Sequence, residues 1–87
     1  MKKLIIYHTD YCGPCRHYIA KVLPDIMAAF PDQVEARNAV NYLNECKRLK
    51  IKHVPAAVLV DRGSETLLSH VPTYEEAAAF LQGGNLA

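Results

Sequence analysis

The chain has 87 residues, of which 51% are hydrophobic and 22% charged, so its composition is that of a small soluble domain and excludes a disordered chain. Ten Lys and Arg residues against nine Asp and Glu residues give a formal charge of +1, which removes the electrostatic case for binding nucleic acid. No apolar run reaches the roughly 18–20 residues of a membrane span, and polar residues from Tyr7 to Asp10 cut short a start that is similar to a signal peptide. We therefore expect one domain over residues 1–87, cytoplasmic and monomeric, with neither a membrane nor nucleic acid as a partner.

The first half of the chain contains signals for two strands and a helix. Lys3 to His8 is a short apolar run that ends at a turn-prone Thr-Asp pair, which predicts a strand buried on both faces. Apolar residues then recur with the 3.6-residue period of a helix from Cys15 to Phe30. Pro24 interrupts this stripe, and we expect it to kink the helix because the stripe resumes on the same face. Val34 to Val40 alternates and predicts a second strand.

The second half contains signals for four more elements. These are a short helix over Tyr42–Lys50, strands over Ala56–Val60 and Glu65–Val71, and a last helix that ends near Gln82, before Gly83-Gly84. Asn41 is a suitable N-cap for the first of them, and Thr73 with Glu76 forms a capping box for the last. The order β-α-β-α-β-β-α predicts an α/β fold in which three helices flank a four-stranded mixed sheet.

Three cysteines are too few, and an odd number, for a small secreted domain held together by disulfide bonds. Cys12 and Cys15 form a C-x-x-C pair. Cys46 stands alone on the apolar face of the predicted second helix, where we expect it to belong to the core. In a cytoplasmic chain, a C-x-x-C pair indicates redox chemistry or metal binding.

The segment Cys12-Gly13-Pro14-Cys15 lies between the first predicted strand and the first predicted helix. Cys15 shares a helix face with apolar residues and points inward, whereas Cys12 precedes the first turn, near the N-cap, and is accessible. Pro14 fits the first helical position, where its missing N–H costs nothing. Gly13 is expected to let the backbone turn tightly beside the sulfur.

A thiolate at Cys12 would face unpaired N–H groups and the positive end of the helix dipole, and both stabilise it. Two cysteines so close together also form a disulfide with little movement of the backbone. The pattern therefore predicts that Cys12 attacks a target disulfide and that Cys15 resolves the mixed disulfide that results.

Half of a zinc site is another interpretation of a C-x-x-C pair, and structural zinc sites take four ligands. The chain offers further candidate ligands, but none of them forms a second paired spacing. They are Cys46, His8, His17, His53 and His70. We therefore expect neither a metal site nor a bound cofactor, with a small zinc protein as the alternative.

Val54-Pro55 stands directly before the predicted third strand. Proline lacks the N–H that a strand interior needs, so the first strand position suits Pro55. X-Pro bonds in tight turns are also where cis peptides occur. The dipeptide alone favours an ordinary trans proline at the start of a strand.

Three features resemble the thioredoxin superfamily in order and spacing. They are the C-G-P-C segment at Cys12–Cys15, the helix interrupted by Pro24, and the segment Ile51–Pro55 before an apolar strand. The resemblance covers nearly the whole chain, and C-G-P-C is the form typical of thioredoxins. The short segment before Cys12 is more similar to glutaredoxins and to small glutaredoxin-like thioredoxins.

This resemblance implies a thioredoxin-like fold in which Pro55 is cis and packs beside the cysteines. It also implies that Tyr11, in the place of a tryptophan, and the backbone of Val54 contact the substrate. The implied activity is that of a protein-disulfide reductase, a thiol-disulfide oxidoreductase that acts on disulfide-containing proteins and is recycled by a thioredoxin-reductase-like reductant.

The chain departs from the family pattern at several positions. Ile6 occupies the place of a buried aspartate that is thought to relay the proton of the second cysteine, and Arg37 falls near the lysine that accompanies it. His8 and Asp10 are the candidates to take over this proton. The residues with which glutaredoxins hold glutathione are absent near Pro72–Glu75.

Two further functions remain open besides the zinc protein. One is a glutaredoxin-like electron donor dedicated to one enzyme, such as a ribonucleotide reductase. The other is a thioredoxin-fold binding module in which the cysteines are incidental. A mostly basic patch near Cys46 is expected to be a solvated face, with docking of an acidic partner as the alternative. It consists of Glu45, Lys47, Arg48, Lys50 and Lys52.

Overall fold

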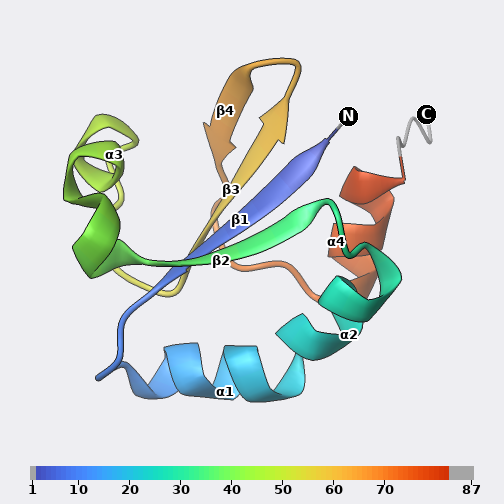
Figure 1. Ribbon diagram of the computed structural model, residues 1–87, viewed down its shortest axis with the longest axis horizontal. Coiled ribbons are helices and arrows are strands. Elements are labelled where there is room, and N and C mark those ends of the chain that lie inside the picture. Colours follow the sequence, from blue (N-terminus) through green and yellow to red (C-terminus); the bar gives the residue numbers. More distant parts are fainter. Residues whose placement is uncertain (1, 83–87) are drawn as a thin grey trace.

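Four strands form one mixed sheet in the computed structural model, which describes residues 2–82 (Figure 1). They are β1 (Lys3–His8), β2 (Val34–Asn38), β3 (Ala56–Asp61) and β4 (Ser64–Leu67), in the spatial order β2-β1-β3-β4. β2 runs parallel to β1 because helices connect the two, whereas β3 is antiparallel to both β1 and β4. The predicted α/β fold with a four-stranded mixed sheet is confirmed.

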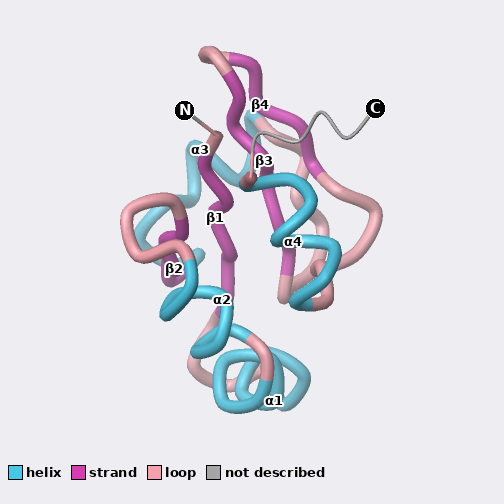
Figure 2. Tube along the Cα trace, turned by 90° about the vertical axis from the view of Figure 1, so that its right-hand side faces the viewer, coloured by secondary structure: helices cyan, strands magenta, loops and turns pink. Residues whose placement is uncertain are grey.

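Helices cover both faces of this sheet. They are α1 (Gly13–Lys21), α2 (Leu23–Ala29), the 3-10 helix η1 (Ala39–Tyr42), α3 (Leu43–Arg48) and α4 (Tyr74–Leu81). Helices α1, α2 and α4 lie on one face and α3 lies on the other, which can be followed in Figure 2. Within residues 2–82, no helix is long and apolar enough to cross a membrane.

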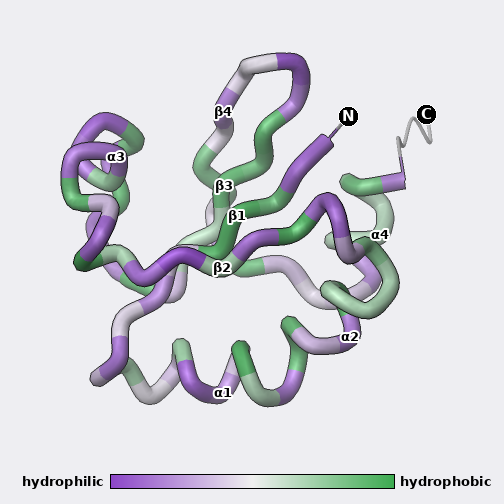
Figure 3. Tube along the Cα trace, in the orientation of Figure 1, coloured by the Kyte–Doolittle hydropathy of each residue, from purple (hydrophilic) through white to green (hydrophobic). Residues whose placement is uncertain are grey.

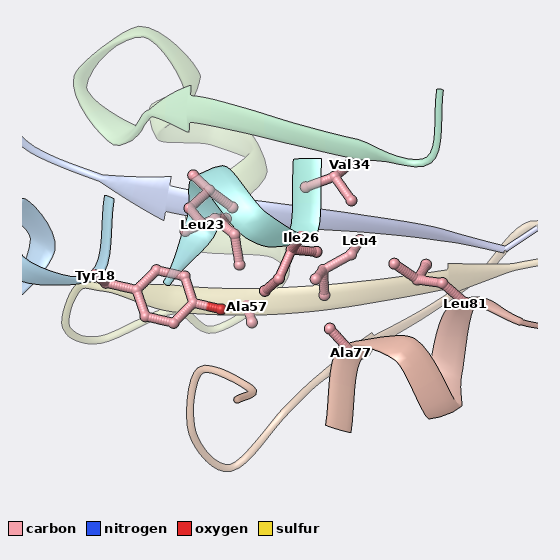
Figure 4. Packing of buried hydrophobic residues seen from close by; sticks show 9 residues of the cluster. Leu4, Tyr18, Leu23, Ile26, Val34, Ala57, Ala77 and Leu81 are labelled. Atoms are coloured by element: carbon pink, nitrogen blue, oxygen red, sulfur yellow. The ribbon is translucent and has the colours of Figure 1, made fainter. Parts of the chain in front are cut away.

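The side chains of β1 alternate between two hydrophobic cores, one on each face of the sheet. Leu4 and Ile6 belong to the first core, between the sheet and the helices α1, α2 and α4. Figure 4 shows Leu4 in this core next to Ile26 of α2. Ile5 and Tyr7 belong to the second core, which also contains Cys46 of α3. The predicted burial of this strand on both faces is confirmed, and Figure 3 shows β1 and β3 as mainly hydrophobic segments at the centre of the fold.

The long helix expected from Cys15 to Phe30 is divided in two, so residues 2–82 contain four α-helices where three were expected. The break is at Val22, whose N–H still donates to the carbonyl of Tyr18 at 2.9 Å. Pro24 lies in the first turn of α2, where its missing N–H is not needed. The chain therefore ends one helix and begins another just before the proline, instead of bending one continuous helix.

Capping residues set two other boundaries. The side chain of Asn38 accepts a hydrogen bond from the N–H of Val40 and starts η1, so β2 ends at Asn38 and the expected cap at Asn41 is wrong. Thr73 accepts a hydrogen bond from the N–H of Glu76, and the Glu76 carboxylate accepts one from the N–H of Thr73. The predicted capping box is confirmed.

Strand β4 is shorter than the expected strand over Glu65–Val71. The N–H of Leu68 donates to the carbonyl of Ala57 at 2.9 Å, and the chain then leaves the sheet. Leu68 and Val71 pack against the first core, so their hydrophobicity reflects contact with that core and not a longer strand. Gly83 and Gly84, which were expected to end the last helix, lie outside the described residues.

Candidate active site

Cys12 and Cys15 lie at the start of α1 and are joined as a disulfide, with their Cα atoms 5.1 Å apart. Cys12 is the N-cap residue, and its Sγ accepts a hydrogen bond from the backbone N–H of Cys15 at 3.0 Å. In the reduced form, the same N–H stabilises a thiolate at Cys12. Cys15 is 0% exposed whereas Cys12 is partly exposed, so Cys12 is the sulfur that a partner can reach.

The peptide bond between Val54 and Pro55 is cis and lies beside this pair. The carbonyl oxygen of Val54 is 3.6 Å from the Sγ of Cys12, which is within reach of a hydrogen bond donated by the reduced thiol. Cys12 and Val54 are 42 positions apart in the sequence. They come together because α1 begins just after Cys12 and β3 begins just after Val54-Pro55. The dipeptide alone favoured a trans proline, whereas the resemblance implied the cis form that the structure has.

The two residues between the cysteines lie in the first turn of α1. The helix begins at Gly13, so Pro14 takes the second helical position and not the first. The second position tolerates a missing N–H equally well, because the first four N–H groups of a helix have no partner within it. A Cβ atom on Gly13 would meet no atom within 4 Å, and the backbone there is not left-handed. The turn at this position therefore does not depend on glycine, and the absence of a side chain at Gly13 leaves open space next to Cys12.

Tyr11 precedes the pair and is 95% exposed, so its ring does not cover the first turn of α1. Nearby, the carboxylate of Asp10 accepts a hydrogen bond from the side chain of Asn38 at 3.2 Å, and its carbonyl accepts one from Arg16. The contact with Asn38 ties the loop before the cysteines to the end of β2, and the contact with Arg16 ties it to α1. An exposed aromatic ring on an anchored loop is a ready contact for another molecule.

No buried acid accompanies the cysteines in the part of the chain that the structure describes, where every buried side chain is non-polar or, at Tyr7 and Tyr18, phenolic. Ile6 is 0% exposed and pairs with Ala36 in the parallel ladder. Arg37 pairs with Tyr7, a residue of the second core. Arg37, which falls near the family's lysine in the sequence, therefore lies on the face of the sheet opposite to Ile6.

Arg37 instead joins a charged network over the second core. Its Nε donates to Glu35 at 2.6 Å, its Nη1 donates to Glu45, and its guanidinium lies 4.8 Å from the ring centre of Tyr42. The hydroxyl of Tyr7 also donates to Glu45. Burial, and then the hydrogen bond to Glu45, raise the pKa of Tyr7 well above its usual range, so this phenol stays protonated.

The network makes stability depend on pH through Glu35. Hydrogen bonds from Arg37 and then from Lys3 lower the pKa of Glu35 from its ordinary value of 4.5 to about 2. Because the folded-state pKa is the lower one, the stabilisation is complete above about pH 4.5 and is lost as the pH falls towards 2.

We expect Glu35→Gln to flatten this dependence, removing about 1 kcal/mol of acid-sensitive stability once solvent screening is allowed for. Urea titrations between pH 7 and pH 2.5 measure it. The exposed Asp32→Asn variant is the control and should keep the wild-type slope. An unchanged slope in Glu35→Gln would show that another group is responsible.

The other candidate residues lie apart from the cysteines. Among residues 2–82, no hydrogen bond joins His8 or Asp10 to either cysteine, and no three His, Cys, Asp or Glu side chains gather as a metal-binding group. His17 is exposed, as expected. Cys46 is 9% exposed in the second core, which confirms its predicted place, and burial raises the pKa of its thiol.

The fold has relatives among solved structures. The chain is similar to the first thioredoxin domain of mouse protein disulfide-isomerase A4, with a TM-score of 0.80 and 16% identity over 94% of this chain. The chain has the thioredoxin fold. The same fold occurs in thioredoxin 1 from Thermosipho africanus (TM-score 0.70, 16% identity, 93% of this chain and 91% of that one) and in desulfothioredoxin from Desulfovibrio vulgaris Hildenborough (TM-score 0.72, 20% identity, 94% and 80%). The chain spans 61% of the mouse structure, which is less than two thirds of its length.

Neither a protein-family model nor a curated protein sequence matches the chain. The solved structures thus show the thioredoxin fold, and the Cys12–Cys15 pair lies within it at the start of α1. The expected likeness to the thioredoxin superfamily is confirmed at the level of the fold.

Proposed function

We propose that this chain is a single-domain protein-disulfide reductase that works as a monomer in the cytoplasm. The observation that supports it best is the position of the Cys12 sulfur, which lies at the N-cap of α1 and accepts the N–H of Cys15. Of the two sulfurs, only this one is partly exposed, and the carbonyl of Val54 lies 3.6 Å away. An accessible sulfur whose thiolate is stabilised, with a buried partner thiol beside it, has what thiol–disulfide exchange requires.

The reaction begins with the reduced chain. The Cys12 thiolate attacks one sulfur of a target disulfide, that disulfide breaks, and the other target sulfur leaves as a thiolate that takes up a proton. Cys15 then loses its proton and attacks the Cys12 sulfur of the mixed disulfide. The second target sulfur leaves as a thiolate, so the target gains two electrons and the Cys12–Cys15 disulfide forms.

Three neighbouring groups are assigned to holding the substrate. The exposed ring of Tyr11 offers a flat apolar contact next to Cys12. The open space at Gly13 lets a polypeptide approach the sulfur. The backbone of Val54 lies close enough to Cys12 to pair with an extended substrate segment on either side of its disulfide.

A reductant must return two electrons to the pair after each cycle, and we assign this role to a thioredoxin-reductase-like protein. The test is reduction of insulin coupled to NADPH consumption, with thioredoxin reductase in one arm and glutathione with glutathione reductase in the other. We expect turnover in the first arm and little in the second. If dithiothreitol with this chain reduces insulin no faster than dithiothreitol alone, the proposed function is wrong. If only the glutathione arm turns over, the chain is a glutaredoxin-like donor.

A further inference from the structure

A groove with a volume of about 360 Å³ lies beside the cysteine pair, between residues 50–57 and residues 67–70. It opens where the ladder between β3 and β4 ends, because the chain leaves the sheet after the hydrogen bond from Leu68 to Ala57. Pro55 lines the groove, and the carbonyl of the preceding Val54 lies 3.6 Å from the Cys12 sulfur. A polypeptide bound at Cys12 is therefore next to this groove.

Apolar and basic side chains line the groove, and we call its exposed basic residues the rim. The apolar side chains include Ile51, Pro55, Ala57, Leu67 and Leu68, and the basic ones are Lys50, Lys52, His53 and His70. None of the residues that line it is acidic. Its volume falls within the range of about 300–1,000 Å³ that is usual for binding pockets. We refer to it as the basic groove.

The positive charge of the basic groove is not neutralised from within. Among residues 2–82, the ion pairs of lysine and arginine are made by Lys3, Arg37 and Arg48, none of which lines the groove. On the rim, His70 contacts Glu76 at 3.2 Å, whereas Lys50 and Lys52 make no ion pair with a described residue. Two exposed ammonium groups thus remain available to an anionic partner.

The backbone at Lys50 is a second, independent feature. Lys50 has a φ of 61°, and the N–H groups of Lys50 and Ile51 donate to the carbonyls of Lys47 and Cys46, which closes the end of α3. This left-handed helix end is the place where glycine costs least, and a lysine is strained there. Strained residues of this kind concentrate at functional sites. Lys50 is also exposed and lines the groove.

We infer that the basic groove binds an acidic, extended segment of the substrate next to its disulfide, so that the chain prefers disulfides flanked by Asp or Glu. This inference rests on the proposed function. An extended segment fits better than a free small anion because it uses the apolar lining as well as the cationic rim. Charge complementarity at the rim supplies selectivity and faster association, both of which decline with ionic strength.

The test uses two cystine-containing peptides that differ only in having Glu or Gln at the positions beside the cystine. We expect kcat/KM to favour the Glu peptide by about tenfold at low salt and by less at 0.5 M salt. Lys50→Gly with Lys52→Gln should bring this ratio close to one. Lys21→Gln, an exposed lysine at the end of α1, is the matched control and should keep the wild-type ratio.

Two further measurements separate the possible failures. Lys50→Gly removes the backbone strain of a left-handed lysine, so the urea midpoint of this variant should rise. A higher midpoint would show that a loss of the preference for the Glu peptide does not come from unfolding. An NMR titration of the oxidised chain with a Glu peptide that carries Ser in place of Cys reports binding without redox chemistry, and we expect shifts at Ala57 and Leu68.

Equal reduction of both peptides would overturn the groove assignment and leave the proposed function intact. If neither peptide is reduced but the NMR shifts still depend on Lys50 and Lys52, the proposed function is wrong and the groove assignment stands. If free glutamate shifts the same amides as strongly as the peptide does, the groove is a small-anion site and the inference is wrong.

Discussion

The Cys12→Ser variant should reduce insulin no faster than the background reaction, a loss of roughly a thousandfold or more relative to the wild type. A serine hydroxyl stays protonated at neutral pH and forms no disulfide, so the first step of the cycle cannot occur. The fold should survive, because serine is a favoured N-cap residue and its oxygen can accept the N–H that the sulfur now accepts.

Cys15→Ser separates the two sulfurs by role. Its Cys12 still attacks, but nothing resolves the mixed disulfide, so a covalent adduct with the substrate should accumulate and appear by mass spectrometry under non-reducing conditions. Cys46→Ala is the control for a missing sulfur, since Cys46 lies in the second core and should leave turnover unchanged. If the adduct accumulated in Cys12→Ser instead, the assigned order of attack would be reversed.

Ile6→Asp should lower the free energy of unfolding by about 4 kcal/mol at pH 7. Ile6 is fully buried in the first core, among apolar side chains of the sheet and helices. A carboxylate there loses its hydration, and no buried charge in the described residues compensates it. This loss is a large fraction of the roughly 5–15 kcal/mol that stabilises a natural domain.

The sign of the pH dependence identifies the cause. Burial raises the folded-state pKa of the new carboxyl above its unfolded value of about 3.9. The penalty for the charge is therefore absent below about pH 4, grows as the pH rises, and is complete above the folded-state pKa. Urea midpoints of Ile6→Asp and the uncharged Ile6→Asn at pH 4 and pH 8 measure the difference. Equal pH dependence of the two variants would mean that water reaches this position.

Several features of the fold and of the candidate site could be predicted from the sequence because their signals are local. The apolar run of β1, the spacing of Cys12 and Cys15, and the capping box at Thr73 each depend on a few consecutive residues. The break at Val22 was missed because a proline in a helical stripe is compatible with either a kink or a new helix, and packing decides between them.

Features that depend on the sheet were harder to predict. Neighbouring residues of a strand point to opposite faces, so the register of β2 against β1 decides that Arg37 faces the second core, and no local signal sets this register. The basic groove brings together Lys50 and His70, which are twenty positions apart in the sequence. It opens because β4 ends early. The left-handed backbone at Lys50 has no signal in the sequence, since glycine is the residue expected there.

The edges of the sheet bear on how the protein behaves at high concentration. β2 and β4 are the outer strands, and an outer strand can recruit another chain into a growing sheet. Here β2 carries the ion-paired Glu35 and Arg37, and β4 has only four residues, all exposed, with Glu65 bound to Arg48. Association at either edge would disturb these charges. The arrangement therefore disfavours pairing between the edges of two sheets, and the protein should not form fibrils by that route at high concentration.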